Sequence, residues 1–457
     1  IVDSSNANLW AARYLPETFK MHKIQKSSSI VFPIEAHKMK CFLPDKIRDQ
    51  PPRSTSAPTP SVGSISTSIG WEANLSDGQI STDASSKNSF SRIPHTRSDL
   101  RAFSSAEMKA ATKNFNRSLI VGEGGFGCIY RGFVKTLADP SKKIEIAVKQ
   151  LGKRGLQGHK EWVTEVNVLG VVEHTNLVKL IGYCAEDDER GTQRLLVYEY
   201  MQNRSVHDHL SSRNLTTIPW ITRLKIAQDA ARGLAYLHQG MDFQIIFRDF
   251  KSSNILLDEN WNAKLSDFGL ARLGPSDGDT HVSTAVVGTL GYASPEYMST
   301  GKLTCKNDVW SYGVFLYELL TGKRPMDRNR PKSEQMLLDW VKPYIGDSKS
   351  FVTIMDAKLE GKYDLRSARK LSIVANRCLV RQPKMRPEMG EVLKMVNKIV
   401  DGVEPEAPLD IMEDNARING DVGVRDERCW TNFVTEFLSS RIVCIWKKKM
   451  LNLNGNK

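Results

Sequence analysis

Residues Ile245 to Gly269 read IIFRDFKSSNILLDENWNAKLSDFG, and the rest of the chain can be ordered around them. Their short runs of Ile, Leu and Phe are typical of strand pieces, and the polar residues fall at the turns between those runs. Such an arrangement can direct four polar side chains into one small space. They are Asp249, Lys251, Asn254 and Asp267.

These four side chains suit the transfer of a phosphoryl group. Asp249 can accept a hydroxyl proton or orient a nucleophile, and Lys251 can neutralise charge on the phosphoryl group. The oxygens of Asn254 and Asp267 are ligands that Mg²⁺ prefers. Each residue alone is more often a plain turn residue, because Asp, Asn and Ser favour turns. The ordered set therefore indicates the chemistry more strongly than any single member does.

A second motif, GEGGFG at residues 122–127, lies between strand-like runs at Leu119–Val121 and Cys128–Arg131. Glycine lets the backbone lie close over phosphates, because no Cβ intervenes. A dinucleotide-binding site would have a helix directly after the glycines, whereas here a strand follows. Taken alone, the motif fits an ordinary tight hairpin equally well.

Lys149 ends the strand-like run IEIAVK, in which the period of two puts Ala147 and Lys149 on the same face. A lysine directed inward beneath a glycine-rich loop can bind phosphate oxygens as a point charge. Glu165, on the helix that follows, can pair with that lysine and fix its direction. The alternative is a surface lysine and a solvated glutamate, which is the commoner fate of both residue types.

The order of strands and helices predicts an α+β fold with two lobes. The first lobe is rich in antiparallel strands and has one main helix near His159–Leu169, and the second lobe is mainly helical. Within the second lobe, Asp308–Leu320 is apolar on nearly every side, which predicts a buried central helix that ends at Gly322. Other strands are expected within 119–149, 177–183 and 194–200, and other helices at 371–379 and 389–400.

Composition divides the chain into four segments. Residues 1–98 form a leader that we expect to be disordered, since its Ser-, Thr- and Pro-rich part cannot bury enough apolar surface to fold. The chain begins with Ile, and we expect the native start at Met39, so that residues 1–38 are not native. A helix capped by Ser104 or Ser105 is expected within 99–114. The folded unit spans 115–400, divided into 115–200 and 201–400, and a mostly disordered tail spans 401–457.

The composition of the whole chain excludes several classes of protein. Seven scattered cysteines without a C-x-x-C pair fit neither a disulfide framework nor a zinc site. No apolar run approaches the ~18 residues that suggest a membrane span. The net charge of +12 favours anionic partners, but no nucleic-acid-binding module is recognisable, so we expect no nucleic-acid partner.

In order along the chain, GEGGFG, AVK, FRDFKSSN, DFG, SPE, DVWSYG and RP resemble the signature set of protein kinases over about residues 115–400. A closer resemblance is to the plant receptor-like cytoplasmic kinases of subfamily VII. It rests on FSSAEMKAATKNF, VGEGGFGCIYRG, HKEWVTEVNVLGVVEHTNLVKLIGYC, LLVYEYMQNRSVHDHL and THVSTAVVGTLGYASPEY. The resemblance implies a two-lobed kinase fold that transfers the γ-phosphate of ATP to Ser/Thr hydroxyls of proteins.

The resemblance also implies a role for each site residue. Asp249 is the expected catalytic base, Lys251 neutralises the phosphate, and Asn254 and Asp267 bind Mg²⁺. Lys149 holds the α- and β-phosphates and pairs with Glu165. Glu296 is expected to pair with Arg386, and Asp308 to anchor the catalytic loop. The expected ATP-binding residues are Val121, Gly122, Gly124, Gly125, Phe126, Gly127, Ile129, Ala147, Lys149, the gatekeeper Tyr198, the hinge residues Glu199 and Met201, and Leu256 beneath the base.

Two residues depart from the kinase pattern. Phe247 stands where a His is usual, and Ser294 stands where an Ala is usual. We expect Phe247 to keep the packing of the usual His, against Phe268 and Leu169, and to give up its hydrogen bond. Because every residue expected to touch phosphate or metal is present, we expect an active kinase. The alternative is a catalytically weak pseudokinase that serves as a scaffold.

Arg248 directly precedes the expected catalytic base. An Arg in that place can bind a phosphate on the activation loop and order the loop through charge-assisted hydrogen bonds. Ser283, Thr284 and Thr289 are the candidate acceptors. The resemblance makes Ser283 and Thr284 the regulatory pair and puts Thr289 nearer the substrate hydroxyl.

The partners that the resemblance implies are protein substrates and receptor kinases of the plasma membrane, in plant immune signalling. The expected location is cytoplasmic and peripheral at the plasma membrane. If the chain starts at Met39, Cys41 beside Lys40 is a candidate acylation site supported by basic residues. An unmodified cytosolic thiol is the alternative.

Overall fold

The computed structural model describes residues 100–403 apart from 125–126, 137–138, 140, 152–155, 189–190, 212–216 and 277. The leader expected over residues 1–98, which includes Met39 and Cys41, lies outside the described residues. So do Gly125 and Phe126 of the glycine-rich motif and nearly all of the expected tail.

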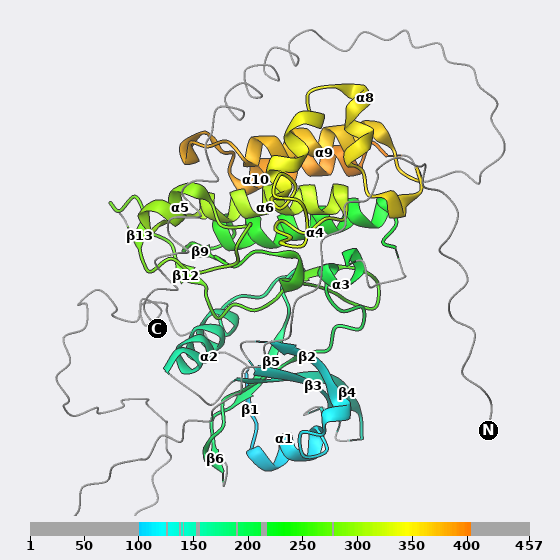
Figure 1. The fold of residues 1–457 in the computed structure, drawn as a ribbon. Coiled ribbons are helices and arrows are strands. Elements are labelled where there is room, and N and C mark those ends of the chain that lie inside the picture. Colours follow the sequence, from blue (N-terminus) through cyan, green and yellow to red (C-terminus); the bar gives the residue numbers. More distant parts are fainter. Residues whose placement is uncertain are drawn as a thin grey trace, which may run out of the picture. The chain divides into compact units, whose positions relative to one another are not determined.

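The first lobe is built on a six-stranded sheet, in the order β1-β5-β8-β4-β3-β2 (Figure 1). All neighbouring strands run antiparallel except β1, which pairs with β5 in parallel. The register sets Lys149 of β4 opposite Ile129 of β3, and Ala147 of β4 opposite Tyr198 of β8. The strands are β1 (Arg101–Ala102), β2 (Ile120–Gly124), β3 (Gly127–Lys135), β4 (Lys143–Leu151), β5 (Leu180–Cys184) and β8 (Leu195–Glu199), with β6 (Asp187–Asp188) and β7 (Gly191–Thr192) in a separate hairpin.

The expected helix near the start of the folded unit is α1 (Ser105–Ala111). Ser104 caps it, because its side chain accepts from the Glu107 N–H while the Glu107 carboxylate accepts from the Ser104 N–H. The helix ends at Ala111, inside the expected range 99–114. Residues 113–115 have φ between 48° and 59°, a left-handed run that turns the chain so that the Phe115 ring meets Tyr130 at 5.4 Å.

The main helix of the first lobe is α2 (Leu156–Leu169), which carries Glu165. It starts three residues before the expected His159. Its Trp162 Nε1 donates to the Leu195 carbonyl at 3.2 Å, and this contact fixes the helix against β8. Figure 1 shows α2 beside the sheet of the first lobe.

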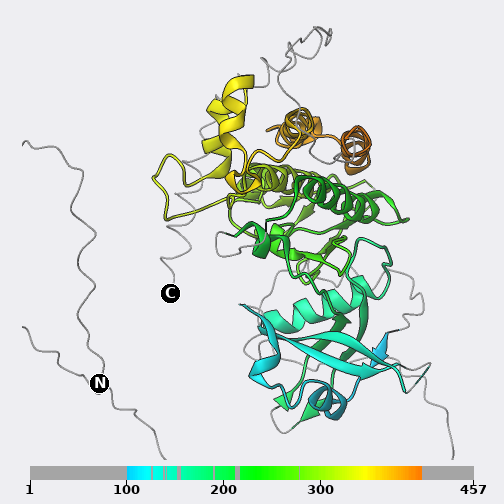
Figure 2. The same ribbon diagram turned by 90° about the vertical axis from the view of Figure 1, so that its right-hand side faces the viewer.

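The second lobe is organised around α6, in which nearly every side chain is buried, as its apolar sequence predicts. Gly322 ends the helix in the left-handed conformation, with φ of 63°. Figures 1 and 2 show α4 alongside α6, with α9 and α10 on their outer side. The helices are α3 (Val206–Leu210), α4 (Trp220–Gln239), α5 (Pro295–Thr300), α6 (Cys305–Thr321), α7 (Leu337–Val341), α8 (Ser348–Phe351), α9 (Leu365–Cys378) and α10 (Met389–Val400).

Residues 245–269 fold into short strands joined by polar turns, as the alternation of apolar and polar runs predicts. They contain β9 (Ile245–Ile246), the 3-10 helix η3 (Ser252–Asn254), β10 (Ile255–Leu257) and β11 (Ala263–Leu265). β10 pairs with β11, β9 pairs with β12 (Arg272–Leu273), and β13 (Val282–Ser283) pairs with β14 (Lys302–Leu303). None of the described helices combines the length and apolar character needed to cross a membrane.

Candidate active site

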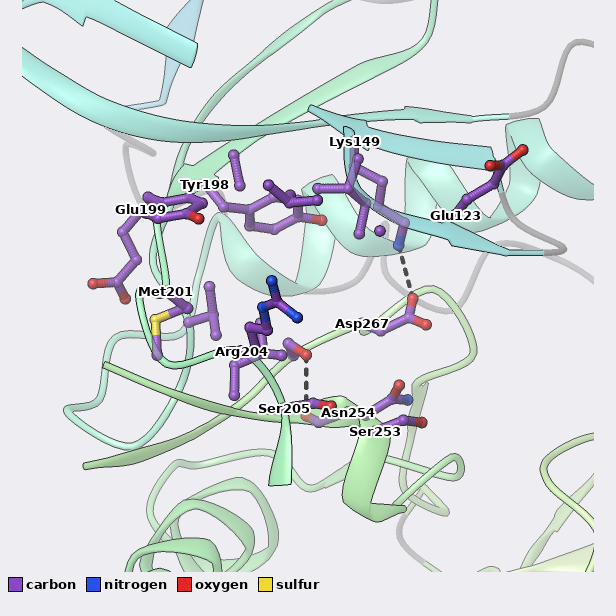
Figure 3. Close-up of a pocket in the computed structure, with 18 of the residues that line it drawn as sticks. Glu123, Lys149, Tyr198, Glu199, Met201, Arg204, Ser205, Ser253, Asn254 and Asp267 are labelled. Atoms are coloured by element: carbon purple, nitrogen blue, oxygen red, sulfur yellow. Dashed lines mark hydrogen bonds and ion pairs between the residues drawn. The ribbon is translucent and has the colours of Figure 1, made fainter. Parts of the chain in front are cut away.

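A cavity of about 530 Å³ lies between the two lobes (Figure 3). Most of the residues that the sequence assigns to ATP binding line this cavity. Asn254 and Asp267, which the sequence assigns to Mg²⁺, line it as well. Gly124 is part of β2 but is not in the lining, and Asp249 and Lys251 lie beside the cavity rather than in its wall. The predicted residues found in the lining are Val121, Gly122, Gly127, Ile129, Ala147, Lys149, Glu165, Tyr198, Glu199, Met201, Asn254, Leu256 and Asp267.

Lys149 is buried and binds two carboxylates at the inner end of the cavity. Its Nζ lies 2.9 Å from Glu165 Oε2 and 2.8 Å from Asp267 Oδ1. Burial disfavours the charged form of Lys149, but the two carboxylates outweigh burial and hold its pKa above the ordinary value. Burial likewise opposes ionisation of Asp267, and Lys149 overcomes it, so the pKa of Asp267 is lowered. Both groups are therefore ionised at neutral pH.

The backbone holds Asp267 in an unusual conformation, with φ of 68°. The next N–H, of Phe268, donates to Glu165 Oε1 at 3.2 Å. The carboxylate of Glu165 thus binds both Lys149 and the segment that carries Asp267. This double contact ties β4, α2 and the Asp267 turn into one unit.

Asp249, Lys251 and Thr289 form a triangle of hydrogen bonds. Asp249 Oδ2 accepts from Lys251 Nζ at 2.7 Å, and Asp249 Oδ1 accepts from the Thr289 hydroxyl at 2.7 Å. Lys251 Nζ also donates to Thr289 Oγ1 at 3.1 Å. Asn254 Nδ2 donates to the Asp249 carbonyl at 3.1 Å, which orders the loop between the two residues. Hydrogen bonds therefore join Asp249, Lys251 and Asn254, and Asp267 lines the cavity together with Asn254.

Asp308 in α6 supports this loop from below. Its carboxylate accepts from the backbone N–H groups of Phe247 at 2.8 Å and Arg248 at 2.7 Å, and it also contacts His238 Nε2 at 2.9 Å. Arg248 has φ of 74°, a conformation that costs an Arg about 1–2 kcal/mol. A buried carboxylate that accepts two backbone N–H groups compensates for that cost.

Phe247 is fully buried and packs as the sequence suggests. Its ring meets Phe268 edge to face, with centroids 4.9 Å apart, and it also contacts Phe250. Leu169 belongs to the same apolar core. Ser294, the other departure from the kinase pattern, accepts a hydrogen bond from Asn307 Nδ2 at 2.6 Å. Both unusual residues are thus accommodated by contacts of their own.

Arg248 joins the loop of Asp249 to the predicted phosphorylation sites. One of its Nη atoms donates to Thr284 Oγ1 at 3.0 Å, and its Nε donates to the Tyr297 hydroxyl at 3.0 Å. Burial and the nearby charge of Arg248 lower the pKa of Arg272, so two cations are close together here. Ser283 is exposed in β13.

Comparison with known proteins agrees with this geometry. The sequence model of the protein kinase domain matches residues 115–396. The chain belongs to the protein kinase family. The kinase is 71% identical over 315 residues to the serine/threonine-protein kinase PCRK1 of Arabidopsis thaliana, covering 69% of this chain and 75% of that protein. It is 62% identical to PCRK2 of the same plant, covering 80% and 88% of the two chains, and 47% identical to the probable serine/threonine-protein kinase PBL2, covering 72% and 79%.

These relatives confirm the resemblance to plant receptor-like cytoplasmic kinases, and the structure agrees with the predicted two-lobed fold. Membership of the family implies that the kinase binds ATP, uses a divalent metal ion and acts on protein substrates.

Several residues of the cavity wall were not predicted from the sequence. Ser205 and Asp208 cap α3, and the spacing S-x-x-D after a strand could have indicated such a cap. Arg204 has φ of 57°, and Figure 3 shows its side chain rising into the cavity. No local signal marks an Arg for this left-handed conformation. The other unpredicted lining residues are Ile120, Glu123, Val178, Tyr200, Ser253 and Ser266.

Proposed function

We propose that this chain is an active serine/threonine protein kinase in which Asp249 is the catalytic base. The observation that carries the proposal is the triangle of Asp249, Lys251 and Thr289. A hydroxyl already donates to Asp249 Oδ1 there, and the same carboxylate oxygen can accept the proton of a Ser or Thr substrate. The relatives PCRK1 and PCRK2 are named serine/threonine-protein kinases, which supports the same conclusion.

The other residues have complementary roles around the phosphates of ATP. Lys149 carries a buried positive charge that suits the α- and β-phosphates, and Glu165 holds it in place. Lys251 can neutralise the transferring phosphoryl group, because its Nζ is already directed at Asp249. Asn254 and Asp267 supply oxygen ligands in the lining of the cavity, a set that fits Mg²⁺. When bound, that ion neutralises charge on the phosphates.

Incubation with Mg²⁺, labelled ATP and a generic protein substrate tests the activity. We expect label on Ser and Thr of the substrate and none on Tyr. The same reaction with Asp249→Asn serves as the comparison, since this substitution removes the base and leaves the fold. Equal labelling by the two proteins would favour the alternative of a scaffold without catalysis.

We also propose that phosphorylation of Thr284 activates the kinase. The Thr284 hydroxyl already contacts Arg248, and Arg272 is close to Arg248, so a phosphate would find two cations there. Ser283 is the second proposed regulatory site, and Thr289, bound to Asp249, is the proposed site nearest the substrate hydroxyl.

Thr284→Ala is expected to lower kcat by about tenfold or more, because the loop loses its charge-assisted contact with the segment that holds Asp249. The measurement compares kcat of the phosphorylated wild-type protein with that of the variant, and mass spectrometry records the loop phosphates. Ser299→Ala, an exposed change in α5, is the control. Full activity of unphosphorylated Thr284→Ala would exclude this mechanism.

The setting that we propose is plant immune signalling downstream of receptor kinases, with the protein at the cytoplasmic face of the plasma membrane. The resemblance to plant receptor-like cytoplasmic kinases supports it. A cytoplasmic location also suits an enzyme that uses ATP.

Cys41 is the proposed point of membrane attachment, through an acyl chain supported by neighbouring basic residues. Cys41→Ser is expected to move the protein from the membrane fraction to the cytosolic fraction of plant cells. Cys128→Ser is the control, because Cys128 lies in β3 of the folded lobe. An unchanged distribution of the Cys41→Ser protein would rule out attachment through this thiol.

A further inference from the structure

The segment that joins α6 to α7 carries an excess of positive charge. Residues 323–332 of this segment read KRPMDRNRPK and contain five basic residues and one acidic residue. Two of these cations are engaged within the fold. Lys323 Nζ lies 4.0 Å from the centre of the Trp340 ring, and Arg330 lies 3.5 Å from Asp327 and 4.0 Å from Glu334.

The other three cations of this segment are exposed: Arg324, Arg328 and Lys332. Within the part of the chain that the structure describes, no carboxylate lies within 4.0 Å of them. An exposed Arg or Lys is ordinarily just solvated, so charge alone does not mark a site. The position of the segment relative to the catalytic base distinguishes these cations from ordinary surface charges.

The segment packs against the loop that contacts the catalytic base. A Cβ added to Gly291 would lie 3.0 Å from Cβ of Pro325, so the two stretches of backbone are in close contact. Gly291 is two residues from Thr289, whose hydroxyl donates to Asp249. Arg324 directly precedes Pro325 and therefore lies near the place where the acceptor residue of a substrate must bind.

Arg324 also acts on groups of α3 and α6. Burial lowers the pKa of His207 in α3, and the positive charge of Arg324 lowers it further. Burial raises the pKa of Glu318 in α6 to about 7, against the opposing effects of its hydrogen bonds with Tyr292 and Ser252 and of the charge on Arg324. The guanidinium is thus within electrostatic reach of both helices that flank the catalytic loop.

The carboxylates on this side of the catalytic loop already have partners. Glu318 accepts from the hydroxyls of Ser252 and Tyr292. Asp208 of α3 accepts from the N–H and hydroxyl of Ser205. Asp249 accepts from Lys251 and Thr289. The exposed charges of the segment itself that have no ion-pair partner among the described residues are positive.

We propose that Arg324, with Arg328 and Lys332 of the same segment, binds acidic residues that flank the acceptor Ser or Thr of protein substrates. This inference rests on the proposed serine/threonine kinase function and adds the substrate class. The fork of an Arg side chain matches a carboxylate in geometry as well as charge. Charges at the edge of a binding site select partners by their complementarity.

A set of three peptides tests the inference. Each has the same length and one Ser, and the four residues on either side are rich in Glu, in Gln or in Lys. For the wild-type kinase we expect kcat/KM to be highest for the Glu peptide, about fivefold above the Gln peptide, and lowest for the Lys peptide. Raising the salt concentration should reduce the difference, because these charges are exposed.

Arg324→Glu is expected to reverse the preference between the Glu and Lys peptides, and the double variant Arg328→Gln with Lys332→Gln to weaken it. Arg369→Glu is the matched control, since Arg369 is an exposed Arg on α9. The KM for ATP and the melting temperature of each variant show that the ATP site and fold are intact.

The possible outcomes separate the two proposals. If the wild-type kinase phosphorylates none of the peptides or protein substrates, the proposed function itself fails. If it phosphorylates the three peptides equally, or if Arg324→Glu keeps the same ranking as Arg369→Glu, the kinase function stands and the assignment of acidic substrates is wrong.

Discussion

Asp249→Asn is expected to lower kcat by about 1000-fold and to leave the affinity for nucleotide unchanged. An amide can still accept a hydrogen bond from Lys251 through its oxygen, so the loop keeps its geometry. It cannot take up a proton from the acceptor hydroxyl. The backbone supports of the loop, from Asp308 to Phe247 and Arg248, are also untouched. The loss should therefore fall on the chemical step.

Two measurements on the same preparations separate this effect from misfolding. Single-turnover kinetics with saturating Mg·ATP give the rate of phosphoryl transfer, and titration with ADP gives the nucleotide affinity. Glu259→Gln is the control, because Glu259 is an exposed carboxylate in the turn between β10 and β11. A rate for Asp249→Asn within about tenfold of wild type would contradict the role of Asp249 as base.

Most of the polar residues of the candidate site could be predicted from the sequence, because the order in which they occur has no other ready explanation. Turn positions between short buried strands direct side chains to one edge, and the order of residue types around them is specific to phosphoryl transfer. The alternation along β4 likewise predicted that Ala147 and Lys149 share one face, and both residues line the cavity. These features depend on local pattern.

Among the contacts between distant residues, those that the kinase resemblance implies were expected, such as Glu296 with Arg386, and the others were not. The two-residue strand β1 joins the sheet through β5, and a strand of that length has no pattern of its own. The bond between Thr289 and Asp249 links residues 40 positions apart. A residue distant in the sequence stabilises the left-handed conformation of Arg204, since the Arg204 carbonyl accepts from the Leu257 N–H at 2.8 Å. In each case the tertiary structure overrides the local preference of the sequence.

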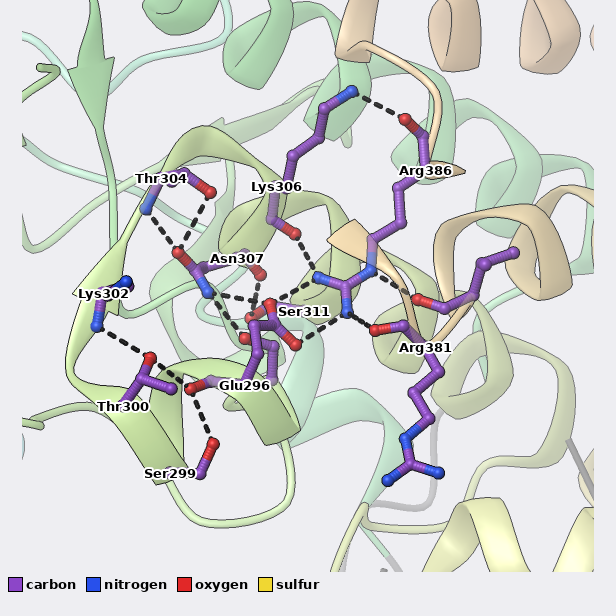
Figure 4. A network of polar contacts seen from close by, with 12 residues as sticks. Glu296, Ser299, Thr300, Lys302, Thr304, Lys306, Asn307, Ser311, Arg381 and Arg386 are labelled. Atoms are coloured by element: carbon purple, nitrogen blue, oxygen red, sulfur yellow. Dashed lines mark hydrogen bonds and ion pairs between the residues drawn. The ribbon is translucent and has the colours of Figure 1, made fainter. Parts of the chain in front are cut away.

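The ion pair between Glu296 and Arg386 shows how a long-range contact can support the site (Figure 4). Arg386 binds both oxygens of Glu296, at 2.7 Å and 2.8 Å, and its Nε donates to the Val380 carbonyl at 2.7 Å. The guanidinium also lies over the Trp310 ring, 4.8 Å from its centre. Because Glu296 lies in the first turn of α5, this pair holds the end of the activation segment against the helical lobe.

Arg386→Met is expected to lower the free energy of unfolding by about 3–5 kcal/mol, because it leaves a partly buried carboxylate and several carbonyls without their donor. In a domain of this size the melting temperature should fall by roughly 10 °C. Differential scanning calorimetry measures the shift. Lys362→Gln is the control, since its ion pair with Glu360 is exposed and the change should move the melting temperature by about 1 °C or less.

Glu296→Gln tests whether charge or shape carries the effect. If charge dominates, this variant should lose most of the stability that Arg386→Met loses, because the buried guanidinium then lacks its counter-charge. The double variant should then be no less stable than Arg386→Met, since the two side chains act as one unit. Additive losses in the double variant would mean that each residue acts through separate contacts, and the pair would not be the brace of α5.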